Sequence, residues 1–223
     1  MVIVGCGKDD NPQNVESYFF DCLDNINVDS LKPSLYTGLP ITCKNEVFID
    51  LFSTNENAWS EFKNSTEGIF EVINGKYSIQ TANYNSFFTR RSLEKFPSNF
   101  EMEVDFKFTQ SLNKSSFFGL TFLGQEWEYY MLGYNLENKA VLAKSIGQNM
   151  PLQIVKSVTT QTYLNEFNKL TVRRIDNMLY FFINENLVFS LNNLEGFGAD
   201  FGFRLPGNSK LEIDNLKIYR WGL

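Results

Sequence analysis

The chain has 223 residues, of which 16% are aromatic, and it carries a formal net charge of -6 at pH 7. This acidic balance, with no basic stripe, argues against nucleic acid as a partner, because a phosphate backbone is bound by clustered Lys and Arg. The sequence contains no histidine, which excludes Ser-His and Cys-His nucleophiles and the usual His-containing zinc and iron sites. No apolar run reaches the length of about eighteen residues that a membrane-spanning helix needs. Any chemistry must therefore rely on carboxylates, Lys, Tyr or a cation bound by oxygen.

Residues 1–13 resemble the end of a bacterial lipoprotein signal and a spacer. Residues 3–6 (Ile-Val-Gly-Cys) match a lipobox, in which the cysteine after a small residue is lipidated, and residues 7–10 (Gly-Lys-Asp-Asp) are similar to the export signal of Bacteroidetes lipoproteins. The resemblance implies a lipid anchor at Cys6 and a location at the bacterial outer membrane or cell surface. The charged region and most of the apolar region that precede a lipobox are missing, which implies a truncated or mis-started chain. The alternative is a cytosolic start with a chance Gly-Cys pair.

Residues 14–45 form an extension before the main body. Within residues 14–26, apolar side chains recur on one helical face and predict a short helix. Prolines and a glycine then predict an extended connector. If Cys6 is lipidated, a disulfide between Cys22 and Cys43 would close a loop of about 20 residues and contribute roughly 3 kcal/mol. Two unpaired thiols are the alternative, and three cysteines alone do not build a zinc site.

Residues 46–223 predict an all-β body. Its clearest segment is FEMEVDFKF, residues 100–108, in which apolar and charged residues alternate without a break. This alternation predicts a long strand with one face in a core and one face in water. Turn pairs such as Asn-Gly separate about fourteen short strands, which predicts a closed or doubly layered antiparallel architecture. The strands are expected at residues 47–52, 68–72, 76–81, 86–90, 99–108, 117–123, 128–134, 140–144, 152–157, 167–173, 178–183, 187–191, 199–204 and 210–219.

Several segments of this body together resemble the concanavalin A-like, laminin-G-type jelly roll. They are IDLFSTNENAW, VINGKYSI, FEMEVDFKF, FNKLTVRRIDNMLYFFINENLVFSL and FGFRLPGNSKLEIDNLKIYRW. Within that group the chain is similar to the bacterial domains described as 3-keto-disaccharide hydrolase-like. The resemblance covers residues 46–221 and implies an antiparallel β-sandwich with a function on carbohydrates. Its motifs describe strands and hairpins, so they are specific for the fold and weak for the activity. One departure is that Asn-Glu-Asn, residues 184–186, replaces the usual Asn-Gly hairpin, although Asn also tolerates the left-handed conformation.

The charged face of the central strand carries the candidate catalytic residues Glu101, Glu103 and Asp105. Family-sixteen glycoside hydrolases, which share this fold, carry a nucleophile and an acid on one face of such a strand. Alternate residues lie about 6.6 Å apart along the backbone, so two of these carboxylates could approach the separation of a retaining mechanism. The alternative is an ordinary solvated sheet face that pairs with Lys169 and Arg173 of another strand.

A second candidate site lies in GQEWEYYMLGYN, residues 124–135. If this segment is extended, Trp127 and Tyr129 share one face, and flat rings of this kind stack on sugars. Glu126 and Asn135 would then bond the sugar hydroxyls. The alternative is that both rings fill the core of the sandwich.

Arg90 and Arg91 form a third candidate, because paired arginines near a cleft grip carboxylates or hydroxyls. A solvated strand end is the alternative. We expect no metal and no cofactor, because calcium, which lectin-like relatives often bind, needs several converging oxygens, and no compact Asp-rich loop follows Asp10.

The sequence therefore favours a carbohydrate-binding, lectin-like module of a cell-surface lipoprotein that captures an oligo- or polysaccharide. One alternative is a glycoside hydrolase of the 3-keto-disaccharide hydrolase-like type that uses carboxylates. Another is a structural or adhesive surface domain that contacts proteins. We expect binding and not turnover, contact with a membrane only through Cys6, and no nucleic-acid partner.

Overall fold

The computed structural model describes residue 36 and residues 44–64, 66–82, 86–111, 113–148 and 150–220. These residues form fifteen strands, all joined by turns and loops. The strands are β1 (Asn45–Asp50), β2 (Phe62–Asn64), β3 (Gly68–Ile73), β4 (Lys76–Thr81), β5 (Phe87–Ser92), β6 (Phe100–Ser111), β7 (Phe118–Gln125), β8 (Glu128–Tyr134), β9 (Lys139–Ile146), β10 (Gln153–Thr159), β11 (Phe167–Ile175), β12 (Met178–Ile183), β13 (Asn186–Asn192), β14 (Asp200–Leu205) and β15 (Ser209–Arg220).

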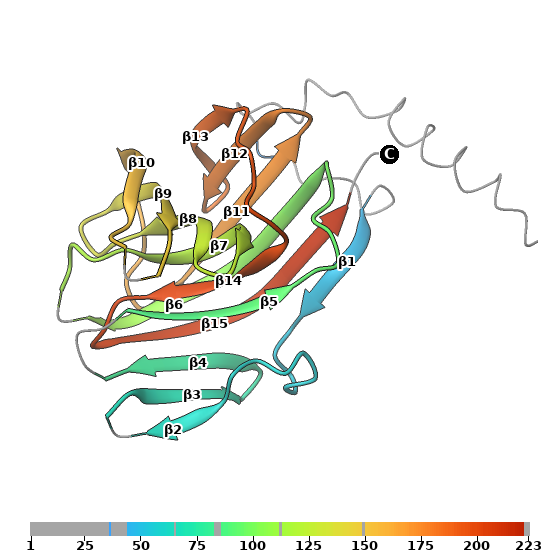
Figure 1. Ribbon diagram of the computed structural model, residues 1–223. Coiled ribbons are helices and arrows are strands. Elements are labelled where there is room, and N and C mark those ends of the chain that lie inside the picture. The colour runs from blue at the N-terminus through green and yellow to red at the C-terminus, as the bar shows by residue number, and fades with distance from the viewer. Residues whose placement is uncertain are drawn as a thin grey trace, which may run out of the picture.

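The strands form two antiparallel sheets that pack face to face. The large sheet has nine strands in the order β13-β12-β11-β6-β15-β4-β3-β2, with β1 also paired to β15. The small sheet has six strands in the order β10-β9-β8-β7-β14-β5. Figure 1 shows β5 and β14 of the small sheet lying over β6 and β15 of the large one. The predicted all-β, antiparallel sandwich is therefore confirmed.

Aromatic side chains fill the space between the sheets. Along β6, Phe100, Met102, Val104, Phe106 and Phe108 all point inward and are at most 1% exposed. Phe, with its flat and rigid ring, suits the half-buried surface of a pleated strand, and alternate residues of a strand share one face. Burial of this apolar row against the small sheet supplies much of the hydrophobic driving force for the sandwich.

Trp59 anchors the segment between β1 and β2 to this core. It is 2% exposed, and its ring stacks on Phe203 of β14 with 4.9 Å between ring centroids. Its Nε1 donates to Asp50 Oδ2 at 2.6 Å, so the indole is satisfied although it is buried. Asp50 also accepts from the backbone N of Phe52 at 2.7 Å. The short strand β2 that follows was not predicted, because its three residues lack any visible alternation.

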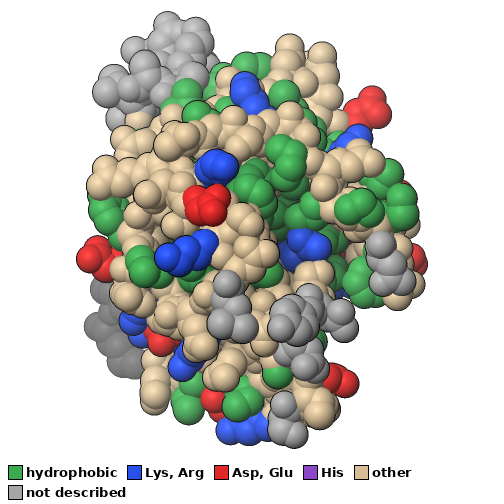
Figure 2. All heavy atoms as spheres, turned by 90° about the vertical axis from the view of Figure 1, so that its left-hand side faces the viewer, with side chains coloured by type: hydrophobic (Ala, Val, Ile, Leu, Met, Phe, Trp, Pro, Cys, Tyr) green, Lys and Arg blue, Asp and Glu red, His purple; other side chains and the backbone are tan. Residues whose placement is uncertain are grey.

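Among the described strands, β10 pairs only with β9 and forms one edge of the small sheet. Ile154, Val155 and Val158 of this strand are between 38% and 50% exposed. Figure 2, which views the molecule from the left-hand side of Figure 1, where β10 lies, shows hydrophobic side chains gathered on that face.

Three predictions concern residues outside the described ranges, namely the helix at residues 14–26, lipidation of Cys6 and the Cys22–Cys43 disulfide. The described residues include no helix of the length and apolar character that crossing a membrane requires.

Candidate functional site

The outer face of the large sheet carries a buried ion pair. Glu101 on β6 lies directly opposite Arg173 on β11. Arg173 Nε and Nη2 lie 2.6 and 2.5 Å from Glu101 Oε2, and Lys44 Nζ lies 2.7 Å from Oε1. The side chains of Glu101 and Arg173 are both fully buried. Cations therefore occupy both carboxylate oxygens of Glu101.

Glu103, two residues along β6, belongs to the same cluster. Lys44 Nζ lies 3.4 Å from its Oε1, Lys169 Nζ lies 3.6 Å from its Oε2, and the Tyr36 hydroxyl donates to Oε1 at 3.5 Å. Burial raises the pKa of Glu103, but its hydrogen bond with Glu101 and the charges of Lys44 and Lys169 outweigh burial and lower the pKa to about 2. Burial, together with the contact to Glu103, raises the pKa of Glu101.

This cluster is poorly placed for hydrolysis. Two carboxyl groups whose pKa values move apart are typical of an acid-base pair. In a retaining glycosidase, however, they stand about 5–5.5 Å apart with the sugar between them. Here the two groups contact each other, and the Tyr36 ring lies beside them, 5.4 Å from the Arg173 guanidinium. Asp105 is bonded instead to Asn215 Nδ2 at 3.0 Å.

The predicted pairing of these carboxylates with Lys169 and Arg173 is present, but the predicted solvent exposure of the face is wrong for Glu101 and Glu103. They are 0% and 9% exposed. Lys44, which precedes β1, contacts both carboxylates.

The second candidate segment places Trp127 at the tip of the β7–β8 hairpin. Trp127 is 44% exposed, and its ring centroid lies 6.1 Å from that of Phe88 on β5. Tyr129 is only 5% exposed and stacks on Phe88 at 4.7 Å with an interplanar angle of 7°. We name Phe88, Trp127 and Tyr129 the aromatic patch. Trp127 and Tyr129 are thus joined through a third ring, because the hairpin bends before β8 begins.

The patch lies on the outer side of the small sheet, away from the core. Tyr129 packs with Met131, Val141 and Ala143 in a separate apolar cluster on that side. The alternative that Tyr129 fills the core between the sheets is therefore wrong. Its ring is buried, but on the outer side of the small sheet. Phe88 was missed because it follows a second Phe and shows no alternation by itself.

Polar groups border the aromatic patch at the start of β14. Asp200 accepts from Arg90 Nη1 at 2.7 Å, from the backbone N of Glu126 at 3.1 Å, and from the Ser92 hydroxyl. The Glu126 side chain is exposed, and its backbone has a φ of 54° in the hairpin turn. Asp200 therefore ties β5 to the turn that presents Trp127.

Two other predicted ligand residues lie elsewhere. Arg91 points into the sandwich, where its Nε donates to the Asn57 carbonyl at 2.5 Å and its guanidinium lies 5.2 Å from the Trp59 ring. Consecutive residues of a strand face opposite sides, so Arg90 and Arg91 do not form one clamp. Asn135 is 1% exposed and accepts from the backbone N of Lys139, at the end of β8 remote from Trp127.

The outer face of the small sheet also holds an unsatisfied hydroxyl. Thr121 on β7 is fully buried, and its Oγ1 has no hydrogen-bond partner among the described residues. Thr121 pairs with Gly202 of β14, and the absence of a side chain at Gly202 lets β5 on the other side of β14 approach closely. Within the same ranges, no group of three or more His, Cys, Asp or Glu side chains is placed to hold a metal ion.

Comparison with known proteins identifies the fold of this chain but not its activity. No protein-family model matches the chain, and no curated protein sequence matches it. Among solved structures, it is similar to a Bacillus subtilis protein of unknown function with a galectin-like fold, with a TM-score of 0.62, 11% identity, and coverage of 79% of this chain and 98% of that one.

Two similar structures differ from each other in function. One is a laminarinase from Flavobacterium sp. UMI-01, with a TM-score of 0.56, 15% identity, and coverage of 79% of this chain and all of that one. The other is the CBM2 module of the evolved Dit protein of Lactobacillus casei BL23 phage J-1, with a TM-score of 0.55, 10% identity, and coverage of 81% and 97%. The chain therefore has the galectin-like, jelly-roll β-sandwich that both binding modules and glycanases use.

Proposed function

We propose that this protein is a carbohydrate-binding, lectin-like module whose ligand stacks on the aromatic patch. The observation that carries the proposal is the half-exposed Trp127 ring, which packs against Phe88, and Phe88 in turn stacks on the buried Tyr129 ring. A flat apolar ring held in place loses little conformational entropy when it covers one face of a sugar ring. The fold likeness to binding modules and glycanases agrees with a ligand of this class.

Charged and polar groups next to the patch supply hydrogen bonds to sugar hydroxyls. Arg90 is 43% exposed at its side chain although it is paired with Asp200, so its free donors face solvent. The exposed Glu126 carboxylate lies next to Trp127 in the chain. Sugar sites combine such convergent polar groups with apolar contact, which fixes the orientation of the ligand.

A glycan-array screen of the full chain tests this proposal. The Trp127→Ala variant should bind its glycan about tenfold more weakly, because it loses a stacking contact of about 1 kcal/mol and the area buried with it. Tyr163→Ala is the matched control, because Tyr163 is 42% exposed and lies in the loop between β10 and β11. Equal loss in both variants, or none in Trp127→Ala, contradicts the proposal.

The hydrolase alternative is tested on the same glycans by product analysis. The opposite pKa shifts of Glu101 and Glu103 favour it, whereas the burial of both groups opposes it. Products that disappear in Glu103→Gln would establish the enzyme. If no glycan binds, the exposed apolar strand β10 makes a protein-contacting surface domain the leading alternative.

We further propose that Cys6 anchors the module to the outer membrane or cell surface, so that the binding face meets polysaccharide outside the cell. The lipobox-like residues 3–6 support this address. Detergent-phase partition of the natural protein should depend on Cys6 and be lost in Cys6→Ser. Peptide maps with and without reduction test a Cys22–Cys43 bridge.

A further inference from the structure

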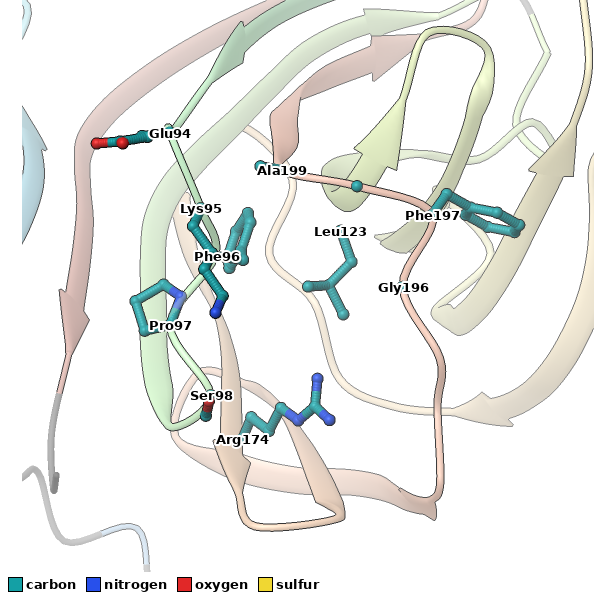
Figure 3. A pocket seen from close by; sticks show the side chains of 11 residues that line it. Glu94, Lys95, Phe96, Pro97, Ser98, Leu123, Arg174, Gly196, Phe197 and Ala199 are labelled. Carbon is teal, nitrogen blue, oxygen red and sulfur yellow. The ribbon is translucent and has the colours of Figure 1, made fainter.

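A separate cavity of about 470 Å³ opens at one end of the sandwich. The loop from β5 to β6, the end of β7, Arg174 of β11 and the loop from β13 to β14 surround it (Figure 3). Its volume falls within the range of about 300–1,000 Å³ that is usual for small-molecule sites. No motif in the sequence indicated this cavity, because its walls come from four separate parts of the chain. The residues that matter below are Lys95, Phe96, Ser98, Leu123 and Arg174.

Backbone hydrogen bonds connect the segments that surround the cavity and fix their positions relative to one another. Phe197 N donates to the Leu123 carbonyl at 2.9 Å, and Leu93 N donates to the Ala199 carbonyl at 3.1 Å. Phe96, at the inner wall, is only 7% exposed and packs in the hydrophobic core. A preformed cavity of this kind binds a ligand without first losing loop entropy.

Two cations face this cavity with free donors. Figure 3 shows the ammonium group of Lys95 and the guanidinium group of Arg174 directed into it, whereas the Glu94 carboxylate points away. The described residues offer Lys95 no ion-pair partner. Arg174 donates from Nε to the Asp176 carbonyl at 3.1 Å, and that contact leaves its terminal nitrogens available. The acidic residues nearest along the chain are Glu94, which also lines the cavity and precedes Lys95, and Asp176, which follows Arg174 by two residues.

These cations differ from those on the large sheet. Lys44, Lys169 and Arg173 each bind a carboxylate there. The protein as a whole is acidic, with a formal net charge of -6. Lys95 and Arg174, which have no carboxylate partner among the described residues, both line this cavity and therefore indicate a site for an anionic group.

We propose that this cavity binds the carboxylate of an acidic monosaccharide, such as a uronic acid residue. The planar guanidinium of Arg174 matches a carboxylate, and the ammonium of Lys95 adds a second charge-assisted contact. Ser98 lies beside them and supplies a hydroxyl for a sugar hydroxyl. Phe96 and Leu123 provide apolar contact for the ring. The assignment of a carboxylate to this ligand rests on the two cations, and the assignment of a sugar rests on the proposed glycan function.

The cavity and the aromatic patch adjoin the same bend of the chain. Leu123, with a φ of 50°, lines the cavity, and Trp127 stands four residues later at the hairpin tip. Gly198 packs against this bend so closely that an added Cβ would lie 2.6 Å from the Gly124 carbonyl oxygen. The bend thus separates two binding surfaces, one for a neutral ring and one for an acidic ring.

Titration calorimetry of the full chain with methyl glucuronide, methyl glucoside and acetate tests the assignment. Methyl glucuronide should bind at least about tenfold more tightly than methyl glucoside at low salt, because hydrogen bonds between charged groups are stronger than those between neutral groups. The preference should shrink in high salt and disappear in the Lys95→Ala/Arg174→Ala double variant. Lys114→Ala is the matched control, because this exposed lysine lies in the loop between β6 and β7, away from the cavity.

The outcomes separate this site from the aromatic patch. Retained preference for glucuronide in Trp127→Ala supports a distinct acidic subsite, even if that variant loses neutral glycans. Equal affinity for glucuronide and glucoside, or an unchanged preference in the double variant, overturns the proposal. Acetate that binds as tightly as methyl glucuronide overturns its sugar part. If the protein binds glucuronide but no neutral glycan, the proposed stacking on the aromatic patch is rejected and the proposed acidic-sugar site in the cavity is supported.

Discussion

Replacement of Glu101 by Gln tests whether the charged cluster on the large sheet is structural. The substitution keeps the shape of the side chain and removes its charge. It removes the negative charge that lies 2.5 and 2.6 Å from the fully buried Arg173 guanidinium. Loss of one partner from a buried ion pair costs about 3–5 kcal/mol. For a domain of this size each kcal/mol lowers Tm by about 2–4 °C, so we expect a fall of about 6–20 °C.

Thermal and urea unfolding followed by circular dichroism would measure this loss. The double variant Glu101→Leu/Arg173→Leu should recover a large part of the stability, because it removes both members of the buried pair. Glu137→Gln is the control, because this carboxylate is 44% exposed and lies 3.8 Å from Lys139 Nζ in a surface pair. If Glu101→Gln unfolds at the same temperature as the natural protein, the cluster does not stabilise the fold, and the argument against a catalytic role weakens.

Two further predictions follow from the structure. The pKa of Glu103 is lowered from 4.5 to about 2, so its ionised form stabilises the folded state above pH 4.5, and this contribution should fade as the pH drops toward 2. Glu103→Gln should flatten the unfolding free energy measured across that interval, and an unchanged slope would contradict the assigned pKa. Gly202→Ala would place a Cβ 2.0 Å from the Thr89 carbonyl oxygen, which forces β14 away from β5 and should cost about 1–3 kcal/mol in urea unfolding. A variant as stable as the natural protein would show that the two strands separate easily.

The candidate sites show where sequence-based interpretation stops. It named Trp127 as a candidate for stacking on a sugar, and this ring is 44% exposed. It could not identify Phe88, which contacts Trp127 and Tyr129 only because β5 and β8 belong to one sheet. It also grouped Arg90 with Arg91, although neighbouring residues of a strand face opposite ways. The cavity lined by Lys95 and Arg174 joins segments about eighty residues apart in the chain.

The sequence by itself determined the strands and the class of fold. Alternation of apolar and polar residues has the period of a strand, and turn residues act over a few positions, so both are local properties that the chain carries in order. Only the tertiary structure decided which charges are buried. Glu101 has the sequence pattern of a solvated residue, yet Arg173 and Lys44, from distant parts of the chain, enclose it and remove it from water. Burial depends on what packs over a face, and that is fixed only when the whole chain folds.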